Sequence, residues 1–172
     1  MLHELRVYTL KPGTAAAAAD TAATLGKDIR GDNYGKLEGY FSTDVGPLNR
    51  AVHFWSHASY EQRTKNRAGL MQNERWVKEY VPQIREKMIH QDVRLLNPII
   101  APRKPAGTGN LYELRFYKLK PTMVKTWLDL FQRYLPARER YSKIVALWHT
   151  EANETNEVVH LWSYPTFQAR LD

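Results

Sequence analysis

The sequence predicts an α+β fold made of tandem ferredoxin-like repeats, of which the second is truncated. Two duplicated blocks lead to this prediction. The segment HELRVYTLKP at His3–Pro12 returns as YELRFYKLKP at Tyr112–Pro121, with seven of ten residues identical and a shift of 112 − 3 = 109 positions. A longer block that begins FSTDVGPLNRAVHFWS at Phe41 returns as WHTEANETNEVVHLWS at Trp148, with a shift of 148 − 41 = 107 positions. Two blocks in the same order at nearly the same spacing indicate an internal duplication.

Each copy predicts the same order of elements. The first strand alternates in polarity and is rich in β-forming residues, and Pro-Gly ends it in the first copy. The next helix contains strong helix formers, and in the second copy Trp127, Phe131 and Leu135 form an apolar stripe at helical spacing. In the first copy we expect strand 2–10, helix 14–29, strands 36–43 and 50–56, helix 59–88 and strand 90–99. This β-α-β-β-α-β order is that of a ferredoxin-like unit with helices on one face of its sheet.

The duplication predicts two repeats joined by a linker. We expect the first repeat at 1–101, a Pro- and Gly-rich linker at 102–110 and the second repeat at 111–172. The first copy continues for 100 − 56 = 44 residues after Ser56, whereas 172 − 163 = 9 residues follow Ser163. The second repeat therefore lacks most of its last helix and its last strand. We expect its first strand to be exposed or to be covered by another subunit.

The helix-free face of each predicted sheet needs a second layer. We therefore expect the two repeats of one chain, or two chains of a homo-oligomer, to pack face to face and to bend into a barrel.

Composition excludes several kinds of site. The 172 residues include no cysteine, which excludes disulfides, thiolate nucleophiles and cysteine-ligated metals. The net charge is +7, but the basic residues are scattered and no nucleic-acid-binding motif accompanies them, so we expect no nucleic-acid partner. No apolar run approaches the ~20 residues of a membrane span, and the first residues lack a signal-peptide pattern. We therefore expect a cytoplasmic protein without a membrane partner, and we expect neither a metal nor a cofactor, since no P-loop or dinucleotide fingerprint is present.

Strand alternation gathers a polar and aromatic set in each copy. Alternate side chains of a strand share a face, and in ELRVY and VHFW we expect the apolar residues to pack on the helices. The other residues are then expected to line a central space on the helix-free side. They form the predicted ligand-binding set: Glu4, Arg6, Tyr8, His53, Trp55, Glu113, Arg115, Tyr117, His160 and Trp162.

Two interpretations of this set remain open from the sequence. In the functional interpretation the set lines a cavity for a small-molecule ligand. The candidate catalytic residues are then His53 as acid or base, Arg6 as a binding group for a carboxylate or enolate, and Tyr8. In the structural interpretation the acidic and basic residues are ion pairs and the tryptophan fills volume. We expect the first-copy set to be the better candidate, because the turn GPLN before its histidine strand becomes NETN in the second copy.

The segments YELRFYKLKP, GYFSTDVGPLNRAVHFWSHASYEQR and RAGLMQNERW resemble the NIPSNAP family. The resemblance covers most of the first copy and the available part of the second. It implies the dimeric α/β-barrel superfamily, in which ferredoxin-like halves make a barrel. Relatives in this wider superfamily include small cofactor-free monooxygenases and haem enzymes, whereas the family itself carries no settled activity to transfer.

Three functional hypotheses follow. The first is a small-molecule-binding protein or cofactor-independent enzyme, oxygenase- or isomerase-like, that acts on a small aromatic or carbonyl compound in the barrel interior. The second is a non-catalytic structural or protein-interaction module. The third is haem binding, for which His53 or His160 would be the candidate axial ligand.

Overall fold

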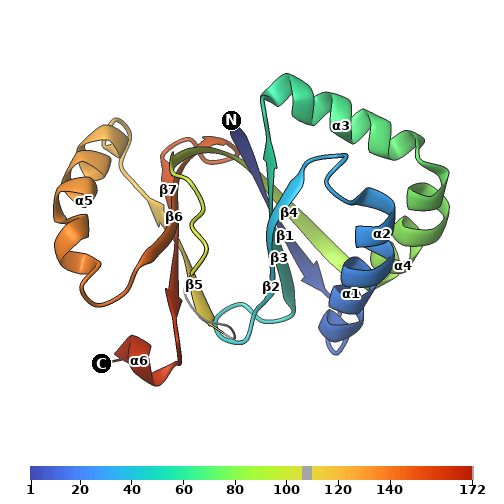
Figure 1. Ribbon diagram of the computed structural model, residues 1–172, viewed down its shortest axis with the longest axis horizontal. Coiled ribbons are helices and arrows are strands. Elements are labelled where there is room, and N and C mark those ends of the chain that lie inside the picture. Colours follow the sequence, from blue (N-terminus) through green and yellow to red (C-terminus); the bar gives the residue numbers. More distant parts are fainter. Residues whose placement is uncertain (106–109, 172) are drawn as a thin grey trace. The chain divides into compact units, whose positions relative to one another are not determined.

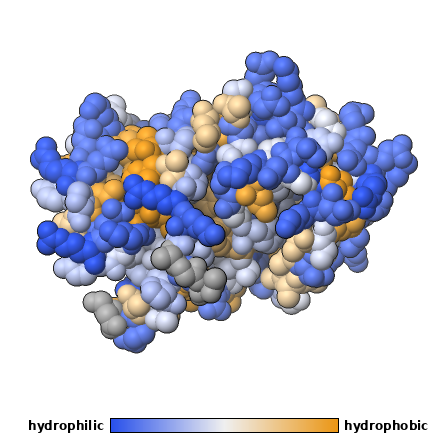
Figure 2. Space-filling view, viewed as in Figure 1, coloured by the Kyte–Doolittle hydropathy of each residue, from blue (hydrophilic) through white to orange (hydrophobic). Residues whose placement is uncertain are grey.

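The computed structural model describes residues 1–105 and 110–171. The chain forms two compact units, Met1–Leu95 and Leu96–Asp172. Within each unit the long helices lie on one side of the strands (Figure 1). Figure 2 shows hydrophilic residues over most of the visible surface, interrupted by separate hydrophobic patches.

The first unit has the predicted β-α-β-β-α-β order, but a π-helical turn (η) interrupts each of its two helical segments. Its strands follow the order β2-β3-β1-β4 across the sheet. The elements are β1 (Leu2–Leu10), α1 (Ala15–Thr21), η1 (Ala22–Gly26), α2 (Lys27–Arg30), β2 (Lys36–Ser42), β3 (Arg50–His57), α3 (Tyr60–Gln72), η2 (Trp76–Tyr80), α4 (Val81–Lys87) and β4 (Met88–Ile100).

Local sequence explains where the second helical segment begins and where a proline falls within it. Helix α3 is capped by Ser59, whose hydroxyl oxygen accepts a hydrogen bond from the backbone N–H of Gln62 at 3.1 Å. Such a cap satisfies one of the backbone donors that a helix start leaves free. Helix α4 follows η2 without a break, and its Pro82 has no backbone N–H to donate to the preceding turn.

The second unit has the shorter set of elements. They are β5 (Leu111–Lys118), α5 (Val124–Arg138), β6 (Ile144–Ala152), β7 (Glu157–Tyr164) and the short α6 (Gln168–Leu171). Strand β5 ends the strand order β6-β7-β5, as expected for a copy without its last strand, and its Phe116 and Tyr117 are each 38% exposed. The predicted apolar stripe of α5 packs on this sheet against Ile144, Leu147 and Trp162.

The two units share details that confirm the duplication. Arg6 lies opposite His53 in the first unit, and the equivalent arginine of β5 lies opposite His160 in the second. A β-bulge follows Leu37 in β2, and the same bulge follows Ile144 in β6, at the predicted shift of 144 − 37 = 107. The predicted fold class, α+β with tandem ferredoxin-like repeats of the dimeric α/β-barrel type, is confirmed.

Strand β4 extends past the end of the first compact unit. Along the chain, the boundary between the units falls between Leu95 and Leu96, whereas the predicted repeats are separated by the linker 102–110. In the second unit Asn97 Nδ2 donates to a carboxylate oxygen of Glu151 at 2.5 Å, which ties the end of β4 to β6. Residues 106–109 of the predicted linker lie outside the described residues.

The predicted orientation of the polar set is wrong. Ala51 of β3 packs with Ala18 of α1 and Ile84 of α4, so the face of β3 that carries Ala51 is covered by helices. Strand alternation and the β1–β3 register place the whole first-unit set on this face: Glu4, Arg6, Tyr8, His53 and Trp55.

The prediction failed because both faces of this sheet are buried. Phe54, on the helix-free face, is 2% exposed, and His53, on the helix-covered face, is 6% exposed. Alternation separates the two faces, but it cannot show which of two buried faces the helices cover.

Candidate functional site

A cavity of about 860 Å³ lies in the first unit between the sheet and its helices. Its sheet side is formed by Tyr8, Tyr40, His53 and Trp55. Its helix side combines small residues of the first helical segment with larger residues of the second: Ala19, Ala22, Ala23, Gly26, Trp76, Tyr80 and Ile84. This volume, with a mainly apolar lining and a few polar groups, is typical of a small-molecule site.

Both π-helical turns of the first unit border the cavity. η1 contributes Ala22 and Gly26, and η2 contributes Trp76 and Tyr80. The two turns are closely packed, because a Cβ built on Gly26 would lie 2.7 Å from Cε2 of Tyr80. A π turn accommodates an extra residue in a helix, and such turns are frequent at functional sites.

His53 faces the cavity as a neutral hydrogen-bond donor. Trp55 Nε1–H donates to His53 Nδ1 at 2.6 Å, so Nδ1 is unprotonated and the proton of the neutral ring lies on Nε2. The ring of Tyr40 stacks on the imidazole, with 5.3 Å between ring centroids. Burial, reinforced by nearby guanidinium groups, lowers the pKa of His53 to about 3. The imidazole is therefore uncharged at pH 7.

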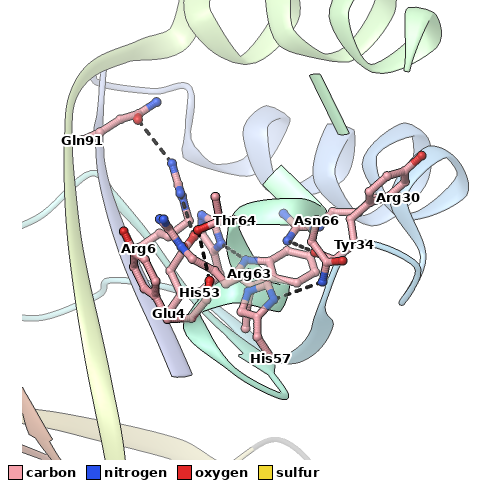
Figure 3. Close-up of polar contacts among 12 residues, drawn as sticks. Glu4, Arg6, Arg30, Tyr34, His53, His57, Arg63, Thr64, Asn66 and Gln91 are labelled. Atoms are coloured by element: carbon pink, nitrogen blue, oxygen red, sulfur yellow. Dashed lines mark hydrogen bonds and ion pairs between the residues drawn. The ribbon is translucent and has the colours of Figure 1, made fainter. Parts of the chain in front are cut away.

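Glu4 lies behind the cavity wall between two guanidinium groups (Figure 3). Arg6 Nη1 donates to Glu4 Oε1 at 2.7 Å, and Arg63 Nε donates to Glu4 Oε2. Burial raises the pKa of Glu4, but the two arginines outweigh burial and hold the pKa at about 2. Arg6 Nε also donates to the hydroxyl oxygen of Tyr8 at 2.7 Å, which fixes this cavity-lining side chain. The network orients Tyr8 and occupies both oxygens of Glu4.

Arg30 is a buried cation on the cavity wall. Its guanidinium carbon lies 3.3 Å from the ring centroid of Trp55, a cation–π contact. Nη2 donates to the backbone carbonyl of Tyr34 at 2.9 Å, but the buried Nε has no hydrogen-bond partner. Burial lowers the pKa of Arg30 to about 10, which still leaves the group charged at neutral pH.

Arg67 of α3 also lines the cavity. The side chain is half-buried, and among the described residues no group forms a hydrogen bond or ion pair with its guanidinium. Burial, together with the positive charge of Arg6, lowers the pKa of Arg67.

The second unit contains the same histidine–tryptophan pair but has its helix face filled. Trp162 Nε1 donates to His160 Nδ1 at 2.6 Å, as in the first unit. Trp127 and Phe131 of α5 lie against this imidazole, with ring centroids 5.9 and 5.5 Å away. His160 Nε2 is buried without a hydrogen-bond partner, and burial lowers the pKa of His160 to about 4.

The first helices of the two copies correspond until the π turn. Phe131 occupies the position of Ala22, at a shift of 131 − 22 = 109. The guanidinium of Arg138 lies over the second-unit tryptophan as Arg30 lies over Trp55, at a shift of 138 − 30 = 108. The one-residue difference falls within the segment that forms η1. Aromatic rings in the second unit thus occupy the space that small residues leave open in the first.

The predicted ligand-binding residues do not share one space on the helix-free side. Each set faces the helices of its own unit. In the first unit Tyr8, His53 and Trp55 line the cavity, and Glu4 and Arg6 lie behind it. The second-unit members lie on the sheet face that packs against α5: Glu113, Arg115, Tyr117, His160 and Trp162.

Sequence reasoning missed the helix side of the cavity. The alanines of the first helix were interpreted only as helix formers, and Arg30 and Arg67 were not singled out. The available signal was the contrast between the copies, because small residues such as Ala22 align with large ones such as Phe131.

The cavity does not suit His53 as a metal or haem ligand. A histidine that ligates a metal through one nitrogen generally donates a hydrogen bond from the other. Here Nδ1 accepts from Trp55, so Nε2 carries the proton and has no free lone pair. Within residues 1–105 and 110–171, no three His, Cys, Asp or Glu side chains are grouped to hold a metal ion. In the described part of the chain, every helix is too short or too polar to cross a membrane.

The family model described as NIPSNAP matches residues 3–101 and 112–172. The chain belongs to the NIPSNAP family. Among its NIPSNAP relatives, protein NipSnap homolog 3B of Homo sapiens is 30% identical over 166 residues, which are 93% of this chain and 66% of that protein. The NipSnap homolog of Dictyostelium discoideum is 24% identical over 151 residues, 84% of this chain and 64% of that protein. The chain thus spans just under two thirds of the length of these relatives.

Solved structures show the same family and fold. An uncharacterized NIPSNAP-like domain protein from Burkholderia xenovorans has a TM-score of 0.56 and 35% identity, covering 60% of this chain and 90% of that one. A putative monooxygenase from Lactobacillus acidophilus has a TM-score of 0.70 and 14% identity, covering 98% of this NIPSNAP chain and 79% of that protein. An anthrone oxidase-like protein has a TM-score of 0.70 and 13% identity, covering 99% of this chain and 75% of that protein. The last two likenesses show the fold alone.

Proposed function

We propose that this NIPSNAP chain binds a small organic molecule in the cavity of the first unit. The contrast between the two copies carries this proposal. The first helix presents Ala22 where α5 presents Phe131, so one helix face leaves a cavity of about 860 Å³ and the other is filled. Protein interiors are close-packed and rarely keep large empty spaces. A ligand that enters this space would restore the missing contacts.

The polar groups of the cavity suit recognition of an oxygen-bearing ligand. His53 offers Nε2–H as a donor, and its neutrality keeps that donor available across the physiological pH range. The hydroxyl of Tyr8, fixed by Arg6, and the guanidinium of Arg67 line the same space. A small number of polar groups in an apolar pocket is typically enough to fix a ligand's orientation.

The catalytic form of this proposal is a cofactor-independent, oxygenase- or isomerase-like enzyme. A pKa of about 3 makes His53 a poor general base at pH 7, so its role would be to donate a hydrogen bond to a carbonyl or enolate oxygen. Arg6 would position Tyr8 rather than contact the ligand. The names of two proteins of this fold, a putative monooxygenase and an anthrone oxidase-like protein, support this form.

The alternative, a non-catalytic structural module, fits the second unit. There the imidazole Nε2 of His160 is buried under aromatic rings, and Glu113 is paired with Arg115 and Arg170. There Trp127 and Phe131 lie against the imidazole, in the space that is open in the first unit. We therefore assign ligand binding to the first unit alone.

Filling the cavity tests the proposal. Ala22→Phe places in η1 the ring that the second unit carries in α5. We expect the neutral fluorescent dye N-phenyl-1-naphthylamine to bind the unmodified protein with one site and to lose this binding in Ala22→Phe. The readout is dye fluorescence titrated against protein.

Ala16→Phe is the matched control. Ala16 lies on the same helix but is exposed, and its counterpart at the shift of 109 is the exposed Lys125. We expect this variant to bind the dye as the unmodified protein does. Equal dye binding by Ala22→Phe and Ala16→Phe, or no binding by the unmodified protein, would contradict the proposed site.

A further inference from the structure

The cavity has an excess of positive charge. Among its described lining residues one is acidic, the exposed Asp32. Four lining residues are basic: Lys27, Arg30, Arg67 and Arg85. Lys27 and Arg85 are exposed, whereas Arg30 is 4% exposed and Arg67 is half-buried. The charges that most need a counter-ion are therefore the two arginines that are partly or fully removed from water.

Glu4 does not supply this counter-ion. Its two carboxylate oxygens already accept hydrogen bonds from Arg6 and Arg63, so two guanidinium groups share a single carboxylate. Arg30 and Arg67 add positive charge beside a network that is already positive. The positive charges of Arg30 and Arg67 both lower the pKa of His53.

Donors on these two arginines are unused. Arg30 Nε is buried without a hydrogen-bond partner. Arg67 has neither an ion pair nor a hydrogen bond within the described part of the chain. A buried guanidinium without a counter-ion is costly, and the planar fork of arginine is suited to a carboxylate. The rest of the lining is alanine, glycine and aromatic surface, which suits an apolar body.

We infer that the ligand of this cavity is an amphipathic organic acid, bound as its carboxylate. Its anionic group pairs with the guanidinium of Arg67, close to the buried positive charge of Arg30, and its apolar body packs on the small residues of α1 and η1. This inference rests on the proposed function, because it names the chemical class of the ligand at the same site.

A pair of competitors that differ only in their head group tests the inference. Decanoate and decanol are titrated against the protein loaded with N-phenyl-1-naphthylamine. We expect decanoate to displace the dye at a concentration at least tenfold lower than decanol does. As a readout that does not depend on the dye, decanoate should raise the melting temperature of the unmodified protein more than decanol does.

Arg67→Met should abolish this preference, because decanoate displacement should weaken about tenfold more than decanol displacement does. Lys65→Met is the matched control, because it removes one positive charge from an exposed position of the same helix that does not line the cavity. We expect it to retain the tenfold preference. Arg67→Met should also raise the melting temperature of the ligand-free protein, because it removes a charge that lacks a partner.

The outcomes separate the two proposals. If decanoate and decanol displace the dye equally, or if Lys65→Met weakens decanoate as much as Arg67→Met does, the acid inference is wrong. The proposed cavity would still stand if Ala22→Phe abolishes dye binding in the same experiments. If Ala22→Phe binds the dye normally, the cavity itself is not the site and both proposals fail.

Discussion

At the scale of single residues, one hydrogen bond serves both units but has different consequences. In each unit a tryptophan Nε1–H donates to the Nδ1 of a histidine two residues earlier at 2.6 Å. The bond fixes the ring orientation and places the proton on Nε2. The Nε2 of His53 lies at a cavity wall, whereas that of His160 is enclosed without a partner. The surroundings, rather than the pair itself, decide which histidine can meet a ligand.

The low pKa of His53 predicts a loss of stability in acid. The unfolded chain binds a proton at this residue below pH 6.5, whereas the folded protein does so near pH 3. Between these pH values the unfolded state therefore holds more protons at this residue than the folded state does. The stability that depends on the neutral imidazole is complete above pH 6.5 and is lost as pH falls toward 3. For His53→Gln we expect the slope of unfolding free energy against pH to decrease by about 1 kcal/mol per unit between roughly pH 5 and 6.

Urea unfolding at a series of pH values measures this slope. Glu4, whose folded pKa is about 2, loses its contribution mainly below pH 4.5 and so does not obscure the comparison. If His53→Gln has the slope of the unmodified protein, the buried imidazole is not neutral in the way that the structure indicates.

Sequence alone predicted which residues share a face but not the face that the helices cover. Alternation correctly grouped Glu4, Arg6 and Tyr8 with His53 and Trp55. The orientation was wrong because charged residues were expected away from the helices. Glu4 is in fact 0% exposed beneath them, which is tolerated because Arg63 of α3 reaches down to pair with it. That contact joins positions 59 residues apart, and no local pattern reveals it.

At the scale of elements, the two copies differ in their first helical segment as well as in the elements that the second copy lacks. The first copy builds it from α1, η1 and α2, and the second from the continuous α5. Trp127 and Phe131 of α5 stack with 4.6 Å between ring centroids and fill the space above the sheet. The equivalent first-copy residues, Ala18 and Ala22, are too small to do so. Equivalent sheets in the two units are thus covered by side chains in one case and border a cavity in the other.

Removing the filling ring from the second unit should destabilise it. Phe131→Ala deletes a half-buried ring from the cluster that packs on Ile144 and Trp162. We expect the free energy of unfolding to fall by about 2–3 kcal/mol, less than the ~3–5 kcal/mol typical of a core phenylalanine, because the ring is half-buried. Chemical denaturation measures this change. A loss below about 0.5 kcal/mol, the range of ordinary surface substitutions, would show that the ring does not contribute to packing between α5 and the sheet.

The π turns could not be predicted from local composition. Their residues have no composition that distinguishes them from the α-helix on either side, and they depend on tertiary contacts such as Gly26 against Tyr80. The helices themselves were predicted, since strong helix formers and an apolar stripe at helical spacing are local features.

At the scale of the whole molecule, the chain contains a duplicated fold with one candidate site. The duplication and the element order were predictable because they are repeated in the sequence. The shorter set of elements in the second copy was predictable because few residues follow its histidine strand. The strand expected at 90–99 is observed at Met88–Ile100, two residues longer at its start and one at its end. Its residues from Leu96 onward belong to the second unit, in which Asn97 donates a hydrogen bond to Glu151.

An asymmetric chain predicts an asymmetric response to ligand. We expect N-phenyl-1-naphthylamine to slow backbone hydrogen exchange in η1, η2 and α4, which border the cavity. Exchange in α5 should not change, because the aromatic rings of that helix already occupy the equivalent space. Mass spectrometry of peptides with and without dye measures both. Equal protection of α5 would contradict the assignment of binding to the first unit.

The π turn η1 also has a consequence for the gene. The shift between the copies is 109 at Ala22, 108 at Arg30 and 107 at Leu37, so two single-codon differences separate them, one inside a helix and one in the following loop. A codon inserted into a regular helix rotates every later residue by about 100°. The π turn absorbs that rotation, and Arg30 stays over Trp55. An in-frame deletion of one codon within 22–26 should therefore alter the cavity wall while the helix keeps its register at both ends.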